Sequence, residues 1–265
     1  MRSGERKSME RQLPDLTNQG KMVYFGYRPV AEAEKVRLVQ RHFNTVAPKY
    51  NLMNTILSFG LHYLWKRMAI KMLGLKPGDW VIDVCGGTGD LAILAARTVG
   101  TSGRVTLYDF NRPMMDAGKP NVARSSLTRR IMYVQGDAEQ LSMADQSFDA
   151  AMVGFGIRNL THMDRGFQEI HRVLKPGGKL MCLEFSKPTS PWFRWLYDSY
   201  SFSIMPLVGK ILVGSWEAYT YLPESIRMFP LPEELRGILE RIGFSQVTQR
   251  RLTNGIAVVH LGTKA

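Results

Sequence analysis

A glycine-rich turn flanked by carboxylates is the part of the sequence best suited to chemistry. An apolar run that contains Asp83 leads directly into it. The turn consists of Gly86, Gly87, Thr88 and Gly89. Glycine lets the backbone approach a ligand more closely than residues with side chains do, so the turn predicts a ligand-binding loop. Asp90 follows immediately and places a negative charge beside that ligand.

The order of the glycines separates two kinds of cofactor. Dinucleotide-binding turns space their glycines as G-x-G-x-x-G to admit a pyrophosphate, whereas here the run is Gly-Gly-Thr-Gly followed by Asp90. A carboxylate there would repel a diphosphate, but it suits the cationic sulfonium and ammonium groups of S-adenosylmethionine. A P-loop is excluded because no lysine-serine or lysine-threonine pair follows the glycines. We therefore expect S-adenosylmethionine, with a nicotinamide dinucleotide as the rival.

Two further acids follow later strands of the predicted fold. Asp109 lies twenty residues after Gly89, a spacing at which a carboxylate accepts the hydrogen bonds of a ribose diol. Its alternative role is to cap the next helix, which Asn111 could do equally well. Asp137 ends the third strand beside the same crevice, where it would accept a hydrogen bond from an adenine amino group. A surface turn is the alternative for Asp137.

Short apolar runs alternate with helical stretches along most of the chain. Strands are expected at residues 80–85, 104–109, 131–137, 148–156 and 179–186, and helices at 91–99, 114–124, 163–174 and about 233–242. This alternation predicts an α/β fold with helices on both faces of a parallel sheet. Combined with the expected S-adenosylmethionine cofactor, it indicates a Rossmann-like sheet of the class I methyltransferase type. Ligands of such sheets bind at the carboxyl ends of the strands. Runs at 245–252 and 257–264 predict an antiparallel hairpin that closes the sheet.

The chain divides into three expected parts. Residues 1–30 are polar and charged and are expected to form a flexible basic tail. Residues 31–76 carry apolar residues at helical spacing, which predicts a helical cap of two or three helices. Residues 77–265 form the methyltransferase-like domain, with an insertion rich in aromatics and proline at about 188–230.

Composition limits the partners and the setting. The 265 residues carry a net charge of +12, which favours an anionic partner such as nucleic acid, an acidic ligand or a membrane surface. Cys85 and Cys182 both lie in apolar runs, which predicts buried thiols and a reducing cytosolic setting. The first thirty residues lack a secretory signal, and no run approaches the roughly 18 apolar residues of a membrane-spanning helix. Any membrane contact is therefore expected to be peripheral.

Five stretches carry a resemblance to one enzyme family. They are HFNTVAPKYNLMN at 42–54, DVCGGTGDL at 83–91, FGIRN at 155–159, VLKPGGKLMCLEFSKP at 173–188 and YLPESIRMFP at 221–230. From about Arg41 onward the chain resembles the ubiquinone and menaquinone biosynthesis C-methyltransferases, also called demethylmenaquinone methyltransferases. The resemblance implies methylation of a ring carbon of a reduced polyprenyl quinone precursor, either demethylmenaquinol or the benzoquinol of ubiquinone biosynthesis. Methylation of RNA or of another small molecule is the alternative.

The resemblance also implies roles for individual residues. Those expected to contact the cofactor are Thr88, Asp109, Asp137 and Ala138. Gly154 stands where the family commonly has a serine, so a side-chain contact to the cofactor is lost there. Arg158 and Asn159 are implicated in catalysis. Because arginine does not readily give up a proton, we expect Arg158 to stabilise a developing phenolate, directly or through a water that Asn159 orients. The alternative for Arg158 is an ion pair that holds its loop.

The sequence gives weaker predictions for the residues that would bind the methyl acceptor. Tyr50, Asn54, Tyr219 and Tyr221 are weaker candidates for lining a ring pocket, with core packing as the alternative. The aromatic stretch contains Trp192, Phe193, Trp195, Leu196, Tyr197, Tyr200, Phe202, Ile204, Met205, Leu207 and Val208. It suits an isoprenoid tail or an interfacial surface, with Lys187, Arg194 and Lys210 towards anionic headgroups.

These patterns define the expected partners and location. We expect a lipophilic quinol substrate and an anionic membrane surface, reached from the cytoplasm at the inner face of the membrane. The sequence does not decide whether the protein forms a homo-oligomer. No nucleic acid is expected, because no added RNA-binding module is recognisable. No metal is expected either, because the five histidines lack metal-ligand spacing.

Overall fold

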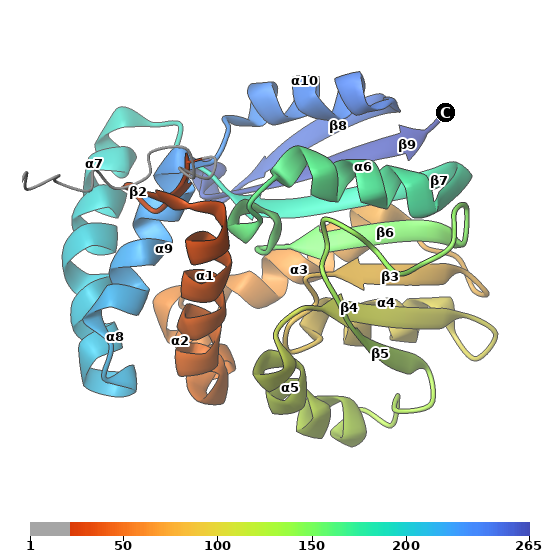
Figure 1. Cartoon of the computed structure of the whole chain (residues 1–265), viewed down its shortest axis with the longest axis horizontal. Helices are drawn as coiled ribbons and strands as arrows, with labels where there is room; N and C mark the ends of the chain where they lie inside the picture. The colour runs from red at the N-terminus through yellow and green to blue at the C-terminus, as the bar shows by residue number, and fades with distance from the viewer. Residues whose placement is uncertain (1–21) are drawn as a thin grey trace, which may run out of the picture.

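The computed structural model describes residues 22–265 and contains one large mixed sheet (Figure 1). Its seven strands have the order β5-β4-β3-β6-β7-β9-β8. They are β3 (Trp80–Val84), β4 (Arg104–Asp109), β5 (Ile131–Gln135), β6 (Phe148–Gly154), β7 (Leu174–Phe185), β8 (Phe244–Leu252) and β9 (Ala257–Lys264). The strands from β5 to β7 pair in parallel, and β9 pairs antiparallel with β7 and β8. The predicted parallel sheet with a closing antiparallel hairpin is confirmed.

Helices cover both faces of this sheet. One face packs against α3 (Leu61–Leu73), α4 (Asp90–Val99) and α5 (Arg112–Arg124). The other face packs against α6 (Met163–Val173) and α10 (Pro232–Ile242). Central strands covered on both sides must be apolar almost throughout, which is why they appear in the sequence as short continuous hydrophobic runs.

The boundary between α6 and β7 differs from the prediction. The helix ends at Val173, one residue before the predicted end, and residues 175–178, which lay between the predicted helix and strand, belong to the start of β7. Leu174 pairs with Phe148, and the register then shifts before Ala150 pairs with Lys179. This irregularity absorbs the extra residues of β7, and a pattern of proline and glycine does not reveal it.

The cap contains the expected helices and one unexpected hairpin. Helices α1 (Glu32–Val46) and α2 (Tyr50–Leu57) precede α3. Strands β1 (Met22–Phe25) and β2 (Arg28–Ala31) form an antiparallel hairpin. Residues 22–30 of the expected flexible tail therefore belong to an ordered hairpin. The hairpin is held because the Phe25 ring stacks on the Tyr221 ring with centroids 4.0 Å apart. Residues 1–21 of the expected tail lie outside the described residues.

The insertion is helical and packs against the cap. It contains α7 (Pro191–Ser199), a π-helical turn (Tyr200–Ile204), α8 (Met205–Val213) and α9 (Trp216–Met228). Val46 and Met53 of the cap share a buried cluster with Met205 and Tyr219 of the insertion. Together they form a helical lobe beside the sheet, at the left of Figure 1. Within residues 22–265, no helix has both the length and the apolar character needed to cross a membrane.

Candidate active site

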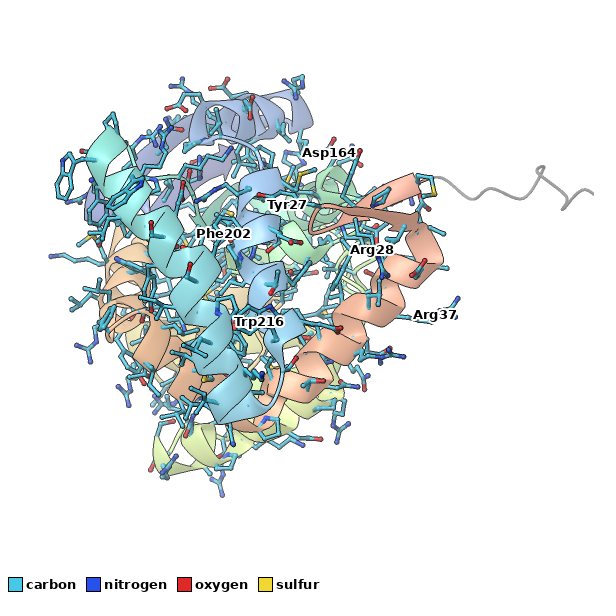
Figure 2. The ribbon with its side chains drawn as sticks, turned by 90° about the vertical axis from the view of Figure 1, so that its left-hand side faces the viewer. Tyr27, Arg28, Arg37, Asp164, Phe202 and Trp216 are labelled. Atoms are coloured by element: carbon cyan, nitrogen blue, oxygen red, sulfur yellow. The ribbon has the colours of Figure 1, made fainter. Side chains whose placement is uncertain are left out.

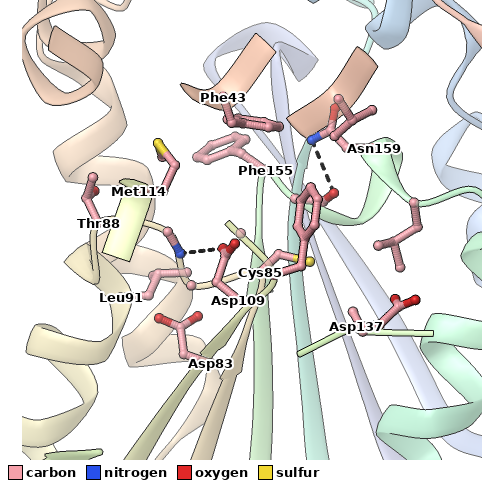
Figure 3. A pocket seen from close by; sticks show the side chains of 18 of the residues that line it. Phe43, Asp83, Cys85, Thr88, Leu91, Asp109, Met114, Asp137, Phe155 and Asn159 are labelled. Atoms are coloured by element: carbon pink, nitrogen blue, oxygen red, sulfur yellow. Dashed lines mark hydrogen bonds between the residues drawn. The ribbon is translucent and has the colours of Figure 1, made fainter. Parts of the chain in front are cut away.

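A cavity lies where β3, β4 and β6 end, and we call it the sheet-edge cavity (Figure 3). The predicted cofactor residues that line it are Asp83, Gly86, Gly87, Thr88, Asp109, Asp137, Ala138 and Gly154. Gly89 does not line it. Gly89 instead precedes α4 with a φ of +80°, and a Cβ atom there would come within 2.9 Å of Leu107 Cδ1. Gly89 therefore shapes the turn, and its contact with the cofactor stays a prediction.

The turn requires small residues because it approaches its neighbours closely. A Cβ atom on Gly86 would lie 2.7 Å from Leu107 Cγ and 3.1 Å from Asp83 Cγ. Cys85 lines the cavity with a φ of +56°, a left-handed conformation that glycine adopts more easily. Burial raises the pKa of its thiol well above the ordinary value. Cys85 and Cys182 are both free thiols, as expected.

Asp109 is fixed by backbone donors. Its Oδ2 accepts from the Gly87 N–H at 2.8 Å, and its Oδ1 accepts from the Asn111 N–H at 2.7 Å. Asn111 in turn caps α5, because its side chain accepts from the Met114 N–H. Burial raises the pKa of Asp109 to about 6. Each carboxylate oxygen keeps further lone-pair capacity, so the group can also accept from a ligand diol.

Asp83 is buried and unsatisfied. Its side-chain oxygens have no hydrogen-bond partner among the described residues, although the residue is only 1% exposed. Burial raises the pKa of its carboxyl to about 8, against a smaller opposing effect of the Ala92 backbone N–H, which lies too far or too oblique for a hydrogen bond of ordinary geometry. An unpaired buried carboxyl is costly, and a cationic ligand group at this point would satisfy it.

Two other polar contacts close the same end of the cavity. Lys66 of α3 forms an ion pair with Asp90, with Nζ 2.6 Å from Oδ2. Asp90 therefore does not present the isolated negative charge that the sequence suggested. The Thr88 hydroxyl donates to Asn51 Oδ1 at 2.9 Å, which ties the turn to α2. Asp137 lies at the opposite end, where its Oδ1 accepts from the Glu139 N–H at 2.9 Å.

A second, larger cavity of about 640 Å³ adjoins the first, and we call it the aromatic cavity. The four weaker candidates, Tyr50, Asn54, Tyr219 and Tyr221, all line it. Arg158 lines only the aromatic cavity, whereas Asn159 lines both cavities. The side chains common to the two cavities are Phe43, Tyr50, Lys66, Phe155 and Asn159. Molecules in the two cavities would meet at this shared wall.

Arg158 is engaged in a buried ion pair. Its Nη1 lies 2.9 Å from Glu184 Oε2, and the two side chains are 7% and 1% exposed. The guanidinium also lies over the Phe185 ring. The structure thus contains the ion pair that was the alternative for this residue. Arg158 Nε is buried and has no partner among residues 22–265.

Asn159 connects the loop after β6 to the helical lobe. Its Nδ2 donates to the Gly156 carbonyl, and its Oδ1 accepts from the Tyr221 hydroxyl at 2.9 Å. Burial raises the pKa of Tyr221 to about 12, so this phenol stays a donor at neutral pH. The His42 ring packs edge-on against Tyr221, and burial together with Arg158 lowers the pKa of His42 to about 4. A neutral imidazole therefore lines the aromatic cavity.

Sequence analysis missed four residues of this arrangement. Glu184 belongs to the LEFSKP stretch and could have been noticed as a lone acid in a buried strand. His42 was considered only as a metal ligand, and no group of three or more metal-ligating side chains occurs within residues 22–265. Nothing in the local pattern distinguishes Phe25 or Lys66, because their partners lie far away in sequence.

Solved structures share this fold. A methyltransferase of Thermotoga maritima that depends on S-adenosylmethionine superposes with a TM-score of 0.59 at 19% identity, covering 86% of this chain and 100% of that one. Phosphoethanolamine N-methyltransferase 2 of Haemonchus contortus, in complex with S-adenosylmethionine, gives 0.54 at 18% identity, covering 75% of this chain and 52% of that one. The fold is that of the class I S-adenosylmethionine-dependent methyltransferases.

Sequence comparison defines the family within that class. Residues 30–264 match the ubiE/COQ5 methyltransferase family, and the chain belongs to it. A relative from Pseudomonas entomophila (strain L48) is 46% identical over 241 residues, which are 91% of this chain and 94% of that protein. One from Stutzerimonas stutzeri (strain A1501) is 44% identical over the same shares. Both are named Ubiquinone/menaquinone biosynthesis C-methyltransferase UbiE. The predicted family, enzyme class and cofactor are confirmed.

Ligand binding in the sheet-edge cavity is predicted to release a proton from Asp83. Because the pKa of this carboxyl is about 8, it is mostly protonated near neutral pH, and a ligand ammonium beside it would favour the carboxylate. S-adenosylhomocysteine should therefore bind more tightly as the pH rises from about 6 to about 8. Calorimetry in buffers of different ionisation enthalpy measures the protons released. Asp83→Asn should abolish this release; an unchanged release in the variant would assign the proton to another group.

The buried ion pair predicts a large difference between single and double substitutions. Arg158→Ala leaves Glu184 without its cation and should lower the free energy of unfolding by about 3–5 kcal/mol. Replacing both residues by methionine removes both charges and should recover most of that loss. Urea denaturation measures these values. Arg236→Ala, which breaks the exposed pair with Glu240, is the control and should cost less than about 1 kcal/mol. Equal losses in the two alanine variants would contradict the assignment.

Proposed function

We propose that this enzyme transfers a methyl group from S-adenosylmethionine to a ring carbon of a reduced polyprenyl quinone precursor. The supporting observation is the pair of adjoining cavities, one acidic and one aromatic, that share Phe43, Tyr50, Lys66, Phe155 and Asn159 as a wall. A water-soluble cationic donor suits the first, and a lipophilic ring with an isoprenoid tail suits the second. The names of the relatives support the same acceptor class.

The residues of the sheet-edge cavity fit the cofactor. When bound, S-adenosylmethionine supplies an electrophilic methyl group on a cationic sulfur. Asp109 would accept from the ribose diol, and Asp137, beside Ala138, from the adenine amino group. The unsatisfied Asp83 would accept from the ammonium group. A Cβ atom at Gly154 would lie 2.5 Å from Leu91 Cδ1, so the leucine occupies the space that a side chain there would need.

The residues of the shared wall would prepare the acceptor. A hydroquinol hydroxyl has an ordinary pKa near that of tyrosine, about 10, and its ring becomes nucleophilic when that proton is removed or strongly held. Asn159 reaches both cavities, and Tyr221 holds its amide in place. We assign to Arg158 the electrostatic stabilisation of the phenolate, exerted from its ion pair with Glu184. Holding donor and acceptor in contact would supply about 7–11 kcal/mol of the lowered barrier.

The acceptor is tested by direct transfer. Purified protein is incubated with labelled S-adenosylmethionine and, separately, a reduced demethylmenaquinone analogue, a reduced methoxy-polyprenyl benzoquinone precursor and bulk RNA. We expect label in one or both quinols. Label in RNA alone would overturn the proposal. The double methionine variant at Arg158 and Glu184 should still bind S-adenosylhomocysteine but lose transfer; full transfer by that variant would remove Arg158 from the chemistry.

We also propose that the enzyme works at the cytoplasmic surface of the membrane, on anionic lipids. Three side chains that line the aromatic cavity are also largely exposed, namely Phe59 at 81%, Leu196 at 50% and Ile204 at 49%. They mark an apolar mouth, and exposed Trp192, Trp195, Leu207 and Ile211 extend it over α7 and α8. Figure 2 faces this side of the lobe, with Phe202 and Trp216 labelled on it. A mouth of this kind would admit an isoprenoid tail from the bilayer.

Vesicle binding tests the surface. Trp195→Ser combined with Ile211→Ser should weaken cosedimentation with vesicles of anionic and zwitterionic lipid several-fold, because both side chains are exposed and apolar. Trp80→Ser is the matched control, since Trp80 is exposed at the opposite end of the sheet, where β3 begins. The contrary result would be that the protein does not bind vesicles, while light scattering shows a dimer that the double substitution dissociates. The apolar face would then be the interface of a homo-oligomer.

A further inference from the structure

The sheet-edge cavity is strongly acidic. The acids that line it are Asp83, Asp90, Asp109, Asp137 and Glu139. Within the described range, Lys66 is the only lysine or arginine that lines it. S-adenosylmethionine carries one carboxylate besides its sulfonium and ammonium groups. A carboxylate placed among these acids needs a cationic partner, since burying an uncompensated charge is costly.

The strand order places Lys66 at one particular end of the cavity. Strand β4 lies between β5 and β3, so Asp109 lies between Asp137 and Asp83, as Figure 3 also shows. With adenine at Asp137 and ribose at Asp109, the amino-acid end of the cofactor falls at Asp83. Asp90, which opens the helix after the same turn, holds Lys66 at this end.

Lys66 has hydrogen-bonding capacity left for a ligand. Its ammonium carries three donors, and Asp90 is its only hydrogen-bond partner among the described residues. The residue is 7% exposed and lines both cavities, so a ligand at the shared wall would meet its side chain. The ion pair with Asp90 offsets part of the cost of burying the ammonium and orients it.

We propose that Lys66 binds the α-carboxylate of S-adenosylmethionine and makes the site selective for nucleosides with an amino-acid end. Together with Asp83 it would hold both charges of that end and so direct the sulfur towards the shared wall. The inference rests on the cofactor contacts in the proposed function but not on the quinol acceptor. A failed quinol assay would therefore leave it intact.

Calorimetry with two ligands tests the carboxylate contact without turnover. The probes are S-adenosylhomocysteine and its analogue without the carboxylate, which keeps the amine. The wild-type protein should bind the analogue about 10- to 100-fold more weakly, the loss expected for one hydrogen bond to a charged group. Lys66→Met should bind the two probes with equal affinity, because its affinity for S-adenosylhomocysteine falls while its affinity for the analogue is unchanged. Equal binding of the two probes by the wild-type protein would overturn the proposal, and this arm needs no variant.

Two variants separate ligand binding from structure. Lys71→Met, an exposed position on the same helix, should keep the wild-type ratio of affinities. Lys66→Arg retains a cation and should keep most of the preference for S-adenosylhomocysteine. If Lys66→Met weakened both probes by the same factor, the lysine would act only through Asp90 on the shape of the cavity, and the proposal would be wrong.

Discussion

Burial of carboxylates at the carboxyl edge of the sheet is the constraint on which this site depends. Parallel strands end at one edge, so the acids at and just beyond the carboxyl ends of β3 and β4 are brought together away from water. The fold compensates them unequally. Asp109 receives two backbone N–H donors and Asp90 receives Lys66, whereas the described residues leave Asp83 without a partner. Burial raises the pKa of Asp83 to about 8, so a cationic ligand group beside it would favour its charged form.

The same edge is coupled to the helical lobe. The loop after β6 begins at Phe155 with a φ of +58°, and the ion pair of Arg158 with Glu184 holds it against the sheet. Asn159 then carries the connection to Tyr221 of α9. Because this loop borders both cavities, the packing of the lobe sets how an acceptor would face the donor. Cap and insertion, which are far apart in sequence, thus act as one structure.

The sequence was most informative where structure is local. Strongly periodic runs predicted the strands, the helices and the closing hairpin, and the glycine turn predicted the position of the sheet-edge cavity. Prediction was weaker where a feature depends on distant packing. The β1–β2 hairpin lies in a polar segment and is stabilised by Phe25 on Tyr221. The reason for a glycine at position 89 is also non-local, because a Cβ atom there would come within 2.9 Å of Leu107 Cδ1.

The sequence by itself determined the residue types, their order along the strands and the family to which the chain belongs. Only the tertiary structure decided how those residues are paired and how they titrate. Arg158 and Glu184 are 26 positions apart, and Lys66 and Asp90 are 24 apart. Partners at such distances are chosen by the packing of whole elements, and the pKa of Asp83 is set by burial that no local pattern contains. The glycine turn could therefore be recognised from the sequence, but the pairing and protonation of the acids around it could not.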